Sequence, residues 1–283
     1  MSDQKNSAGT VLAALGKAVC YLLLFLLCQA LATAVFTLAA ALSLLPVWSG
    51  DPTGLVSAAM AMVMSKAGLI TLISDLAVLV ILTVFFLVRK KKPLAEAGLV
   101  RTEPACVGAA CAAAPLLYAA VTLVMSLLPE AWLESYIDAS AALTQDDVFT
   151  ILATVVLAPI TEEVIFRGLI FSRLERAMPG WLAAVLSALA FGLCHGQPVW
   201  MAYAFVLGLV FAFLRLRTGS ILPSMLAHFI FNGISPVAQR LGDAGAGDGL
   251  ILIALVVLGV LGCVLARRGF RLMLRPGAQG NRS

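Results

Sequence analysis

Apolar runs of about 20 residues recur along this chain, and the charged residues are confined to short gaps between them. A helix of that length crosses the hydrocarbon core of a bilayer, because each residue adds about 1.5 Å to a core about 30 Å thick. The composition agrees, since 61% of the 283 residues are hydrophobic and only 12% are charged, which is far from the average of soluble domains. We therefore predict an all-α, polytopic membrane bundle that forms a single domain over residues 1–283.

About eight segments have the apolar character of membrane-spanning helices. They are residues 19–45, 67–88, 105–128, 148–172, 181–196, 199–214, 219–234 and 249–266. We expect residues 1–147 to be accessory helices, residues 148–234 to be the catalytic core and residues 249–266 to be the last transmembrane helix. The first run is longer than the core of a signal peptide and has no clear small-residue cleavage site after it, so we expect it to be retained.

The gaps between these segments alternate in charge. Basic residues follow the second, fourth, sixth and eighth segments, whereas acidic residues follow the first, third and seventh. By the positive-inside rule, both termini of this integral membrane protein are expected on the cytoplasmic side, with the plasma (inner) membrane as its location. The basic run at residues 89–92 is explained by topology alone, and the alternative is that it attracts anionic lipid or an acidic substrate tail.

Neither nucleic-acid binding nor a structural role for the cysteines is expected. The net charge of +4 comes from basic residues beside the ends of the spans, not from a continuous basic face, so we predict no binding to nucleic acid. All six cysteines lie in apolar stretches without C-x-x-C spacing, which argues against a disulfide framework and against a thiolate zinc site. The lipid bilayer is the partner that composition does predict.

Two adjacent acids, Glu162 and Glu163, lie inside the fourth apolar segment. An ionisable side chain at that depth costs about 2.5 to 3.5 kcal/mol on insertion scales, so a functional site with a nearby partner is the default interpretation. Arg167 follows Glu163 by four residues, which places both on one helix face. Glu162 is turned away by about 100° and is expected to be free. We expect one glutamate to be structural and the other to be available for chemistry.

The chain has two histidines, His195 and His228, and both lie in predicted spans. A single histidine inside the membrane is more often a hydrogen-bonding residue between helices than a catalyst. Counted at about 1.5 Å per residue, however, Glu162, His195, His228 and Asn232 lie roughly 13 to 21 Å from the cytoplasmic ends of their helices. All four therefore occupy one slab of the bilayer, as a site built from facing helices requires.

This set of side chains is suited to the attack of water on an amide. Glu162 with an adjacent imidazole can hold and deprotonate a water molecule. A second imidazole and the amide of Asn232 can donate hydrogen bonds to the carbonyl oxygen as it becomes negative. The alternative is a zinc site with Glu162, His195 and His228 as ligands, because two histidines and one glutamate match a known ligand set. The sequence lacks the H-E-x-x-H arrangement, and we favour a mechanism without a cofactor.

Three strings give a specific resemblance: residues 159–168 (PITEEVIFRG), 191–195 (FGLCH) and 228–232 (HFIFN). In order and spacing they resemble the motifs of the CPBP family, which comprises membrane-embedded CAAX-type prenyl endopeptidases and their bacterial relatives. The resemblance covers roughly residues 148–234. It implies an intramembrane endopeptidase in which Glu162 and His195 activate water and His228 and Asn232 stabilise the oxyanion. Glu163 and Arg167 would support the site.

Two other functional classes are alternatives. The first is a non-enzymatic membrane scaffold or a bacteriocin self-immunity protein, in which the polar cluster only fixes helix packing. The second is a proton-coupled transporter, which can also use buried Glu and His but usually shows repeats or broken helices in corresponding halves. For the favoured function, the expected partner is a peptide or protein substrate at the membrane.

Overall fold

The computed structural model describes residues 7–141 and 147–275, and within those ranges it is all-α with no strand. The α-helices in chain order are α1 (Ala8–Leu44), α2 (Pro52–Met64), α3 (Ala67–Val88), α4 (Pro93–Glu96), α5 (Pro104–Ser126), α6 (Glu130–Ala141), α7 (Val148–Ile151), α8 (Ala158–Glu162), α9 (Phe171–Glu175), α10 (Gly180–Leu193), α11 (Pro198–Thr218), α12 (Leu222–Asp243), α13 (Asp248–Leu265) and α14 (Arg267–Leu274). A short 3₁₀ turn, η1 (Leu45–Val47), follows α1. Two π-helical segments, η2 (Leu152–Leu157) and η3 (Glu163–Ile170), join α7, α8 and α9. The predicted fold class is confirmed.

Each of the eight predicted segments is helical, but not all of them have the length and apolarity of a membrane span. Six helices of the described chain do: α1, α3, α5, the continuous helix from α7 to α9, α11 and α13. The fifth predicted span is α10, whose 14 residues rise only about 21 Å, less than the thickness of the hydrocarbon core. The seventh is α12, which has 22 residues but includes polar side chains such as His228, Asn232 and Arg240. The predicted count of about eight is therefore approximate.

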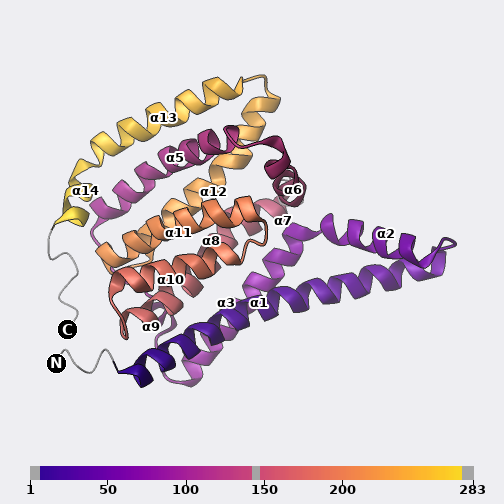
Figure 1. Ribbon diagram of the computed structural model, residues 1–283, viewed down its shortest axis with the longest axis horizontal. Helices are drawn as coiled ribbons and strands as arrows, with labels where there is room; N and C mark the ends of the chain where they lie inside the picture. Colours follow the sequence, from indigo (N-terminus) through magenta and orange to yellow (C-terminus); the bar gives the residue numbers. More distant parts are fainter. Residues whose placement is uncertain (1–6, 142–146, 276–283) are drawn as a thin grey trace.

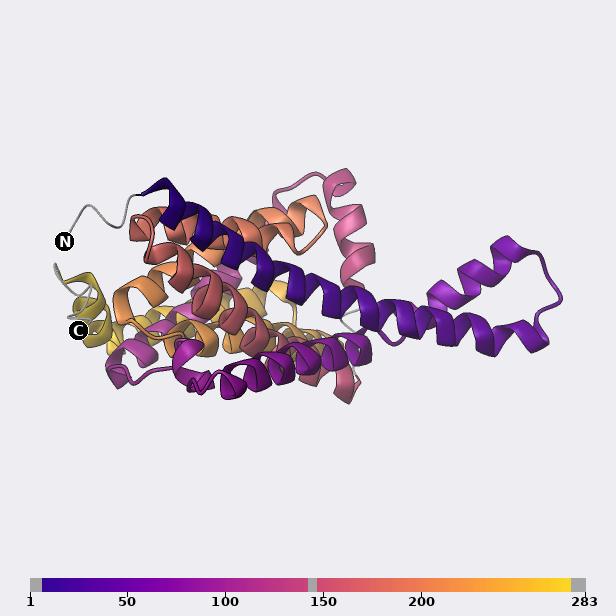
Figure 2. The same cartoon turned by 90° about the horizontal axis from the view of Figure 1, so that it is seen from below.

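The structure adds a helical hairpin to the predicted first span. Helix α1 begins at Ala8, 11 residues before the predicted start, and its 37 residues correspond to about 55 Å, well beyond the thickness of a bilayer core. Helix α2, which the apolar runs did not predict, folds back against the end of α1. Figures 1 and 2 show this end of α1 and α2 extending past the rest of the bundle. The local start signal is nevertheless present, because the Asp51 side chain accepts a hydrogen bond from the Gly54 N–H and Pro52 occupies the first turn.

The fourth predicted span is one continuous helix of 28 residues, Val148–Glu175, but its pitch is not uniform. It widens to a π-helix in η2, immediately before Pro159, and again in η3, which begins at Glu163. Proline has no N–H to donate and its ring clashes with the carbonyl four residues earlier, so a widened turn before Pro159 is the expected accommodation. Widened turns of this kind occur frequently at functional sites, and here one of them carries the second glutamate.

The bundle has two hydrophobic cores. The first joins α1 and α3 to η3, α9 and α10. The second joins α5 and α12 to α14. Helix α11 contributes to both, with Ala204 and Ala212 in the first and Leu207 and Phe211 in the second. Figure 1 shows α8, α10, α11 and α12 side by side in the middle of the bundle. The side chains predicted to form the site therefore come from helices that belong to both cores.

Two glycines let backbones approach closely around this helix. A Cβ built at Gly168 would lie 2.2 Å from the carbonyl oxygen of Ala97 in the turn after α4, and one at Gly208 would lie 3.0 Å from the Cβ of Ala188. Figures 1 and 2 also show that α1 begins and α14 lies at the same end of the bundle. The assignment of that end to the cytoplasm stays a prediction from the charges.

Candidate active site

The predicted ion pair between Glu163 and Arg167 is present. The Arg167 Nη1 lies 2.8 Å from the Glu163 Oε1, and both side chains are fully buried, with 0% of their surface exposed. The guanidinium carbon also lies over two aromatic rings, 4.2 Å from the centroid of Phe191 and 5.3 Å from that of Phe211. Aromatic faces attract a cation most strongly when it is withdrawn from water. Arg167 is thus fixed by a carboxylate in its own helix and by rings from α10 and α11.

His228 connects the two glutamates. Its Nδ1 lies 3.3 Å from the Glu163 Oε1 and its Nε2 lies 3.6 Å from the Glu162 Oε2. The ring is nearly parallel to that of Phe211, with centroids 4.8 Å apart and planes at 29°. The expectation that Glu162 is left free was therefore incomplete. The number of residues between two side chains predicts contacts only within one helix, whereas His228, the partner of Glu162, comes from α12, 66 residues further along the chain.

His195 is held from the opposite side of the site. It lies just after α10, and its Nδ1 is 2.9 Å from the carbonyl oxygen of Phe191. A carbonyl can only accept, so Nδ1 carries the proton and Nε2 is left as an acceptor in the neutral ring. The ring packs against Phe191 and Trp200, with centroids 4.9 and 5.4 Å away. This arrangement fixes the tautomer and the orientation of the imidazole.

Asn232 lies one turn after His228 on α12. Its Nδ2 donates a hydrogen bond of 2.8 Å to the carbonyl oxygen of Thr154. That carbonyl belongs to η2, where the widened pitch changes the pattern of backbone pairing. An amide nitrogen has two hydrogens, so this bond positions the side chain and leaves a second N–H for another acceptor.

Four of the predicted residues line one cavity of about 600 Å³: Glu162, His195, His228 and Asn232. Glu163 and Arg167 do not line it. The exposed fractions of the two acids agree with this division, because the Glu162 side chain is 18% exposed and that of Glu163 is 0% exposed. The structure therefore brings all six predicted residues together, with four on the cavity and two behind it.

The cavity also has an aromatic wall that the sequence analysis did not predict. It is formed by Tyr118, Tyr136, Trp200 and Tyr203. Tyr136 packs edge-on against Trp200 and Tyr203, with centroid distances of 5.9 and 6.1 Å. The available signal was Trp200 and Tyr203, three residues apart at the start of an apolar helix. Tyr136 of α6 could not be recognised from its position in an apolar helix, because it lies in a segment that connects two spans.

Asp75, in α3, is a buried acid near the site. Its side chain is 1% exposed, and neither carboxyl oxygen has a hydrogen-bond partner among the residues that the structure describes. The ion pair of Arg167 is made with Glu163. Asp75 is therefore not the carboxylate that pairs with Arg167.

The buried charges nearly balance. Among the three charged groups that this one helix carries at the site, Glu162 and Glu163 would carry two negative charges and Arg167 one positive charge, so one further proton makes these three neutral in sum. Burying net charge is costly, and His228 and Glu162, 3.6 Å apart, are the two groups placed to share that proton. Within residues 7–141 and 147–275, no group of three or more His, Cys, Asp or Glu side chains is arranged to hold a metal ion. We therefore derive no step through a metal.

Comparison with known proteins finds a match to the part of the chain that carries these residues. Residues 144–234 match the family model described as type II CAAX prenyl endopeptidase Rce1-like, so the resemblance drawn from the three motifs is confirmed. Among curated proteins, the chain is 33% identical over 88 residues to "Uncharacterized 24.3 kDa protein" of Escherichia coli, covering 29% of this chain and 41% of that protein. It is 32% identical over 89 residues to "Putative membrane peptidase YdiL" of Bacillus subtilis (strain 168), covering 31% of this chain and 36% of that protein. No solved structure matches the chain significantly.

Proposed function

Residues 144–234 form an Rce1-like segment, and from that premise we propose that this chain is a membrane-embedded endopeptidase. It hydrolyses a peptide bond in a membrane-associated substrate. One observation supports this most directly: Glu162, His195, His228 and Asn232 share a single cavity, and these are the acid, imidazole and amide groups that hydrolysis of an amide needs.

In the proposed reaction, a water molecule lies between Glu162 and His195. The unprotonated Nε2 of His195 accepts a hydrogen bond from the water and orients it. The Glu162 carboxylate takes a proton from the water as its oxygen attacks the carbonyl carbon. A general base in this position typically contributes about 10² to 10⁴ in rate. Glu162 then delivers the proton to the leaving nitrogen as the C–N bond breaks, so the balance is one water consumed and one carboxyl and one amine formed.

His228 and Asn232 stabilise the oxyanion in this proposal. His228 donates its Nδ1–H to Glu163, so it has a second N–H to donate into the cavity when the ring is protonated. Glu163 lies beside the ring at 3.3 Å and favours that cation electrostatically. Asn232 supplies the N–H that Thr154 does not use. Each such donor is typically worth about 10² to 10³ in rate.

The test is cleavage by the purified full-length chain in proteoliposomes. Two probes are used, a peptide with a single membrane anchor and a peptide with a prenylated C-terminus, each with a fluorophore and quencher on either side of the scissile region. Glu162→Gln, His195→Ala and His228→Ala are expected to lose at least 10²-fold in rate while they elute as folded protein. The matched control is Glu103→Gln, which removes an exposed carboxylate far from the cavity.

Cleavage undiminished by Glu162→Gln would overturn the proposal. A protective effect against a peptide toxin that survived Glu162→Gln would instead support the non-enzymatic alternative. Activity lost on chelation and restored by zinc would assign Glu162, His195 and His228 to a metal and overturn the cofactor-free form of the mechanism.

A further inference from the structure

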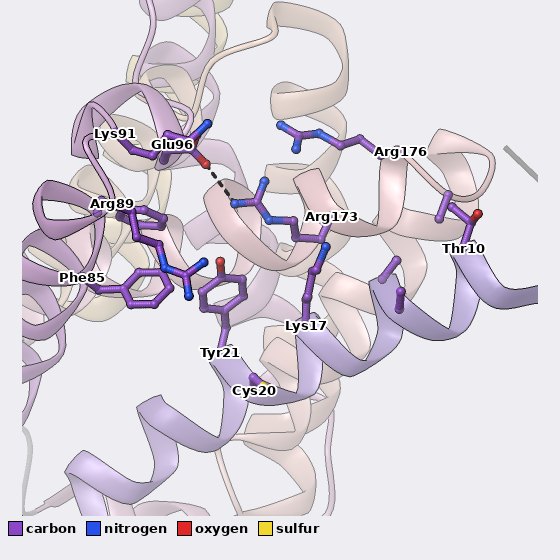
Figure 3. A pocket seen from close by; sticks show the side chains of 14 residues that line it. Thr10, Lys17, Cys20, Tyr21, Phe85, Arg89, Lys91, Glu96, Arg173 and Arg176 are labelled. Carbon is purple, nitrogen blue, oxygen red and sulfur yellow. Dashed lines mark hydrogen bonds and ion pairs between the residues drawn. The ribbon is translucent and has the colours of Figure 1, made fainter. Parts of the chain in front are cut away.

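A second cavity, of about 500 Å³, opens at the end of the bundle where α1 begins and α3 ends. It lies between α1, α3, α4 and α9. Figure 3 shows that charged side chains from four separate segments surround it. They are Lys17, Arg89, Lys91, Glu96, Arg173 and Arg176. The reaction proposed above uses none of them.

The lining has an excess of positive charge. Five of these side chains are basic and one is acidic, so the lining sums to 5 − 1 = +4, or +3 if neighbouring Glu175 is included. Glu96 already accepts from Arg173 Nη2 at 2.9 Å and lies 3.7 Å from Lys91 Nζ. Elsewhere in the described chain, no carboxylate lies within ion-pair distance of Lys17, Arg89 or Arg176. Like charges held this close repel one another, and an anion in the cavity would relieve that repulsion.

These groups converge in space although they are distant in sequence. Figure 3 shows the head groups of Lys17, Arg89 and Arg173 pointing toward a common space beside the hydroxyl of Tyr21. The Arg89 guanidinium is oriented by the ring of Phe85, 4.6 Å away. The positive-inside rule explains why basic residues follow a span. It does not explain why three different helices direct them into one cavity.

Several apolar side chains also line this cavity. Ala13, Ala14, Phe85 and Phe86 form part of its lining. Next to it, α1 and α3 expose apolar side chains, among them Val19 (50% exposed), Leu23 (58%), Val84 (53%) and Val88 (77%). Helices α1 and α3 are both candidate spans, so these faces lie against hydrocarbon. A ligand that suits this place has an anionic head and an apolar tail.

We propose that this cavity binds the phosphate of an anionic phospholipid head group, with the acyl chains along the exposed faces of α1 and α3. A phosphate oxygen pair matches the planar fork of a guanidinium, and lysine adds a point charge. Basic pockets between transmembrane helices bind anionic head groups in this way. The bound lipid would join α1 and α3 to α9, which continues the helix that carries Glu162.

The experiment measures binding of a fluorescent phosphatidylglycerol to the full-length protein in neutral detergent micelles. Arg89→Gln/Arg176→Gln removes two exposed cations that make no ion pair in the described chain, so the fold should be retained. At about 1 kcal/mol per basic residue, binding is expected to weaken about 30-fold. The matched control is Arg267→Gln/Arg268→Gln, which removes the same charge from exposed positions at the same end of the bundle and should change binding less than twofold.

A second variant removes a negative charge instead of positive charges. Glu96→Gln removes the one carboxylate that lines the cavity within the described chain and should tighten binding about fivefold. Three competitors distinguish the source of the phosphate: unlabelled phosphatidylglycerol, glycerol phosphate and inorganic phosphate. Competition by the lipid at concentrations at least tenfold lower than by glycerol phosphate or inorganic phosphate supports the proposal.

Three results would overturn it. Equal weakening by the two double variants would show that only bulk charge matters. Equal competition by glycerol phosphate would remove the lipid as the source of the anion. Displacement of the lipid by a hexaglutamate peptide at a lower concentration than by unlabelled lipid would make an acidic peptide the ligand instead.

Discussion

Replacement of Arg167 by methionine should be among the most destabilising single changes in this protein. The variant keeps most of the volume of the side chain but removes the guanidinium that pairs with Glu163, a fully buried carboxylate 2.8 Å away. Breaking a buried pair by removing one partner costs about 3 to 5 kcal/mol, because the other charge is left uncompensated. The contacts over Phe191 and Phe211 are lost in addition, and a desolvated cation–π contact is worth up to about 2 kcal/mol.

The double variant Glu163→Gln/Arg167→Met separates these two contributions. It removes both charges, so it loses the aromatic contacts but leaves no unpaired buried charge. We expect it to cost about 1 to 2 kcal/mol, and to be more stable than Arg167→Met alone by about 2 kcal/mol or more. Glu163→Gln alone should cost less than Arg167→Met, since Glu162 also acts on the Arg167 charge.

The assay is the free energy of unfolding from titration of the detergent-solubilised protein with sodium dodecyl sulfate, followed by helical circular dichroism. Arg268→Met is the control, because Arg268 is exposed and its replacement should change stability by less than about 0.5 kcal/mol. If Arg167→Met and the double variant lost the same stability, the Glu163 charge left unpaired by Arg167→Met would carry no penalty, and the argument from an uncompensated buried charge would be refuted.

Three further changes have defined outcomes. Gly168→Ala places a Cβ 2.2 Å from the Ala97 carbonyl oxygen and should lower the free energy of unfolding by about 1 to 3 kcal/mol in the same titration. The control is Gly16→Ala, where a Cβ meets nothing within 4 Å, and it should leave the protein equally stable or more stable. The hydrogen bond from Arg173 holds the pKa of Glu96 below its usual value of 4.5. The pair therefore contributes about 1 kcal/mol of stability above pH 4.5, as is typical of a partly exposed pair, and this contribution disappears as the pH falls through the lowered pKa. A difference in melting temperature between wild type and Glu96→Gln that persisted below that pKa would contradict this. Chelation with excess EDTA should leave peptide cleavage unchanged, and the metal content of the purified protein, measured by inductively coupled plasma mass spectrometry, is the matching control.

Local sequence patterns were enough to predict the long helices and to identify the candidate site residues. The apolar runs predicted every long helix because a bilayer imposes both a length and internal backbone pairing on whatever crosses it. The same constraint made Glu162, Glu163, His195 and His228 conspicuous, since a polar side chain in such a run is expensive. The Glu163–Arg167 pair also followed from the sequence, because four-residue spacing brings side chains together in a helix.

Elements with weaker local signals were not predicted. Helix α2 is only 13 residues long, too short to be recognised by length, and it is stabilised by packing against α1. The widened turns of η2 and η3 depend on how backbone carbonyls are paired, which side-chain periodicity does not report. For the same reason the sequence did not predict that the Asn232 amide donates to a carbonyl within η2.

The sequence by itself determined that this chain is a helical membrane bundle and which polar residues its apolar helices carry, because both are properties of single segments and their solvent. Only the tertiary structure decided which of those residues line a cavity and which are buried behind it. It brought His228 from α12 between two glutamates of an earlier helix, left Glu162 on the cavity with Glu163 behind it, and gathered Lys17, Arg89 and Arg176 around a separate cavity. These juxtapositions depend on the distances between helices far apart in the chain, and no local pattern records such distances.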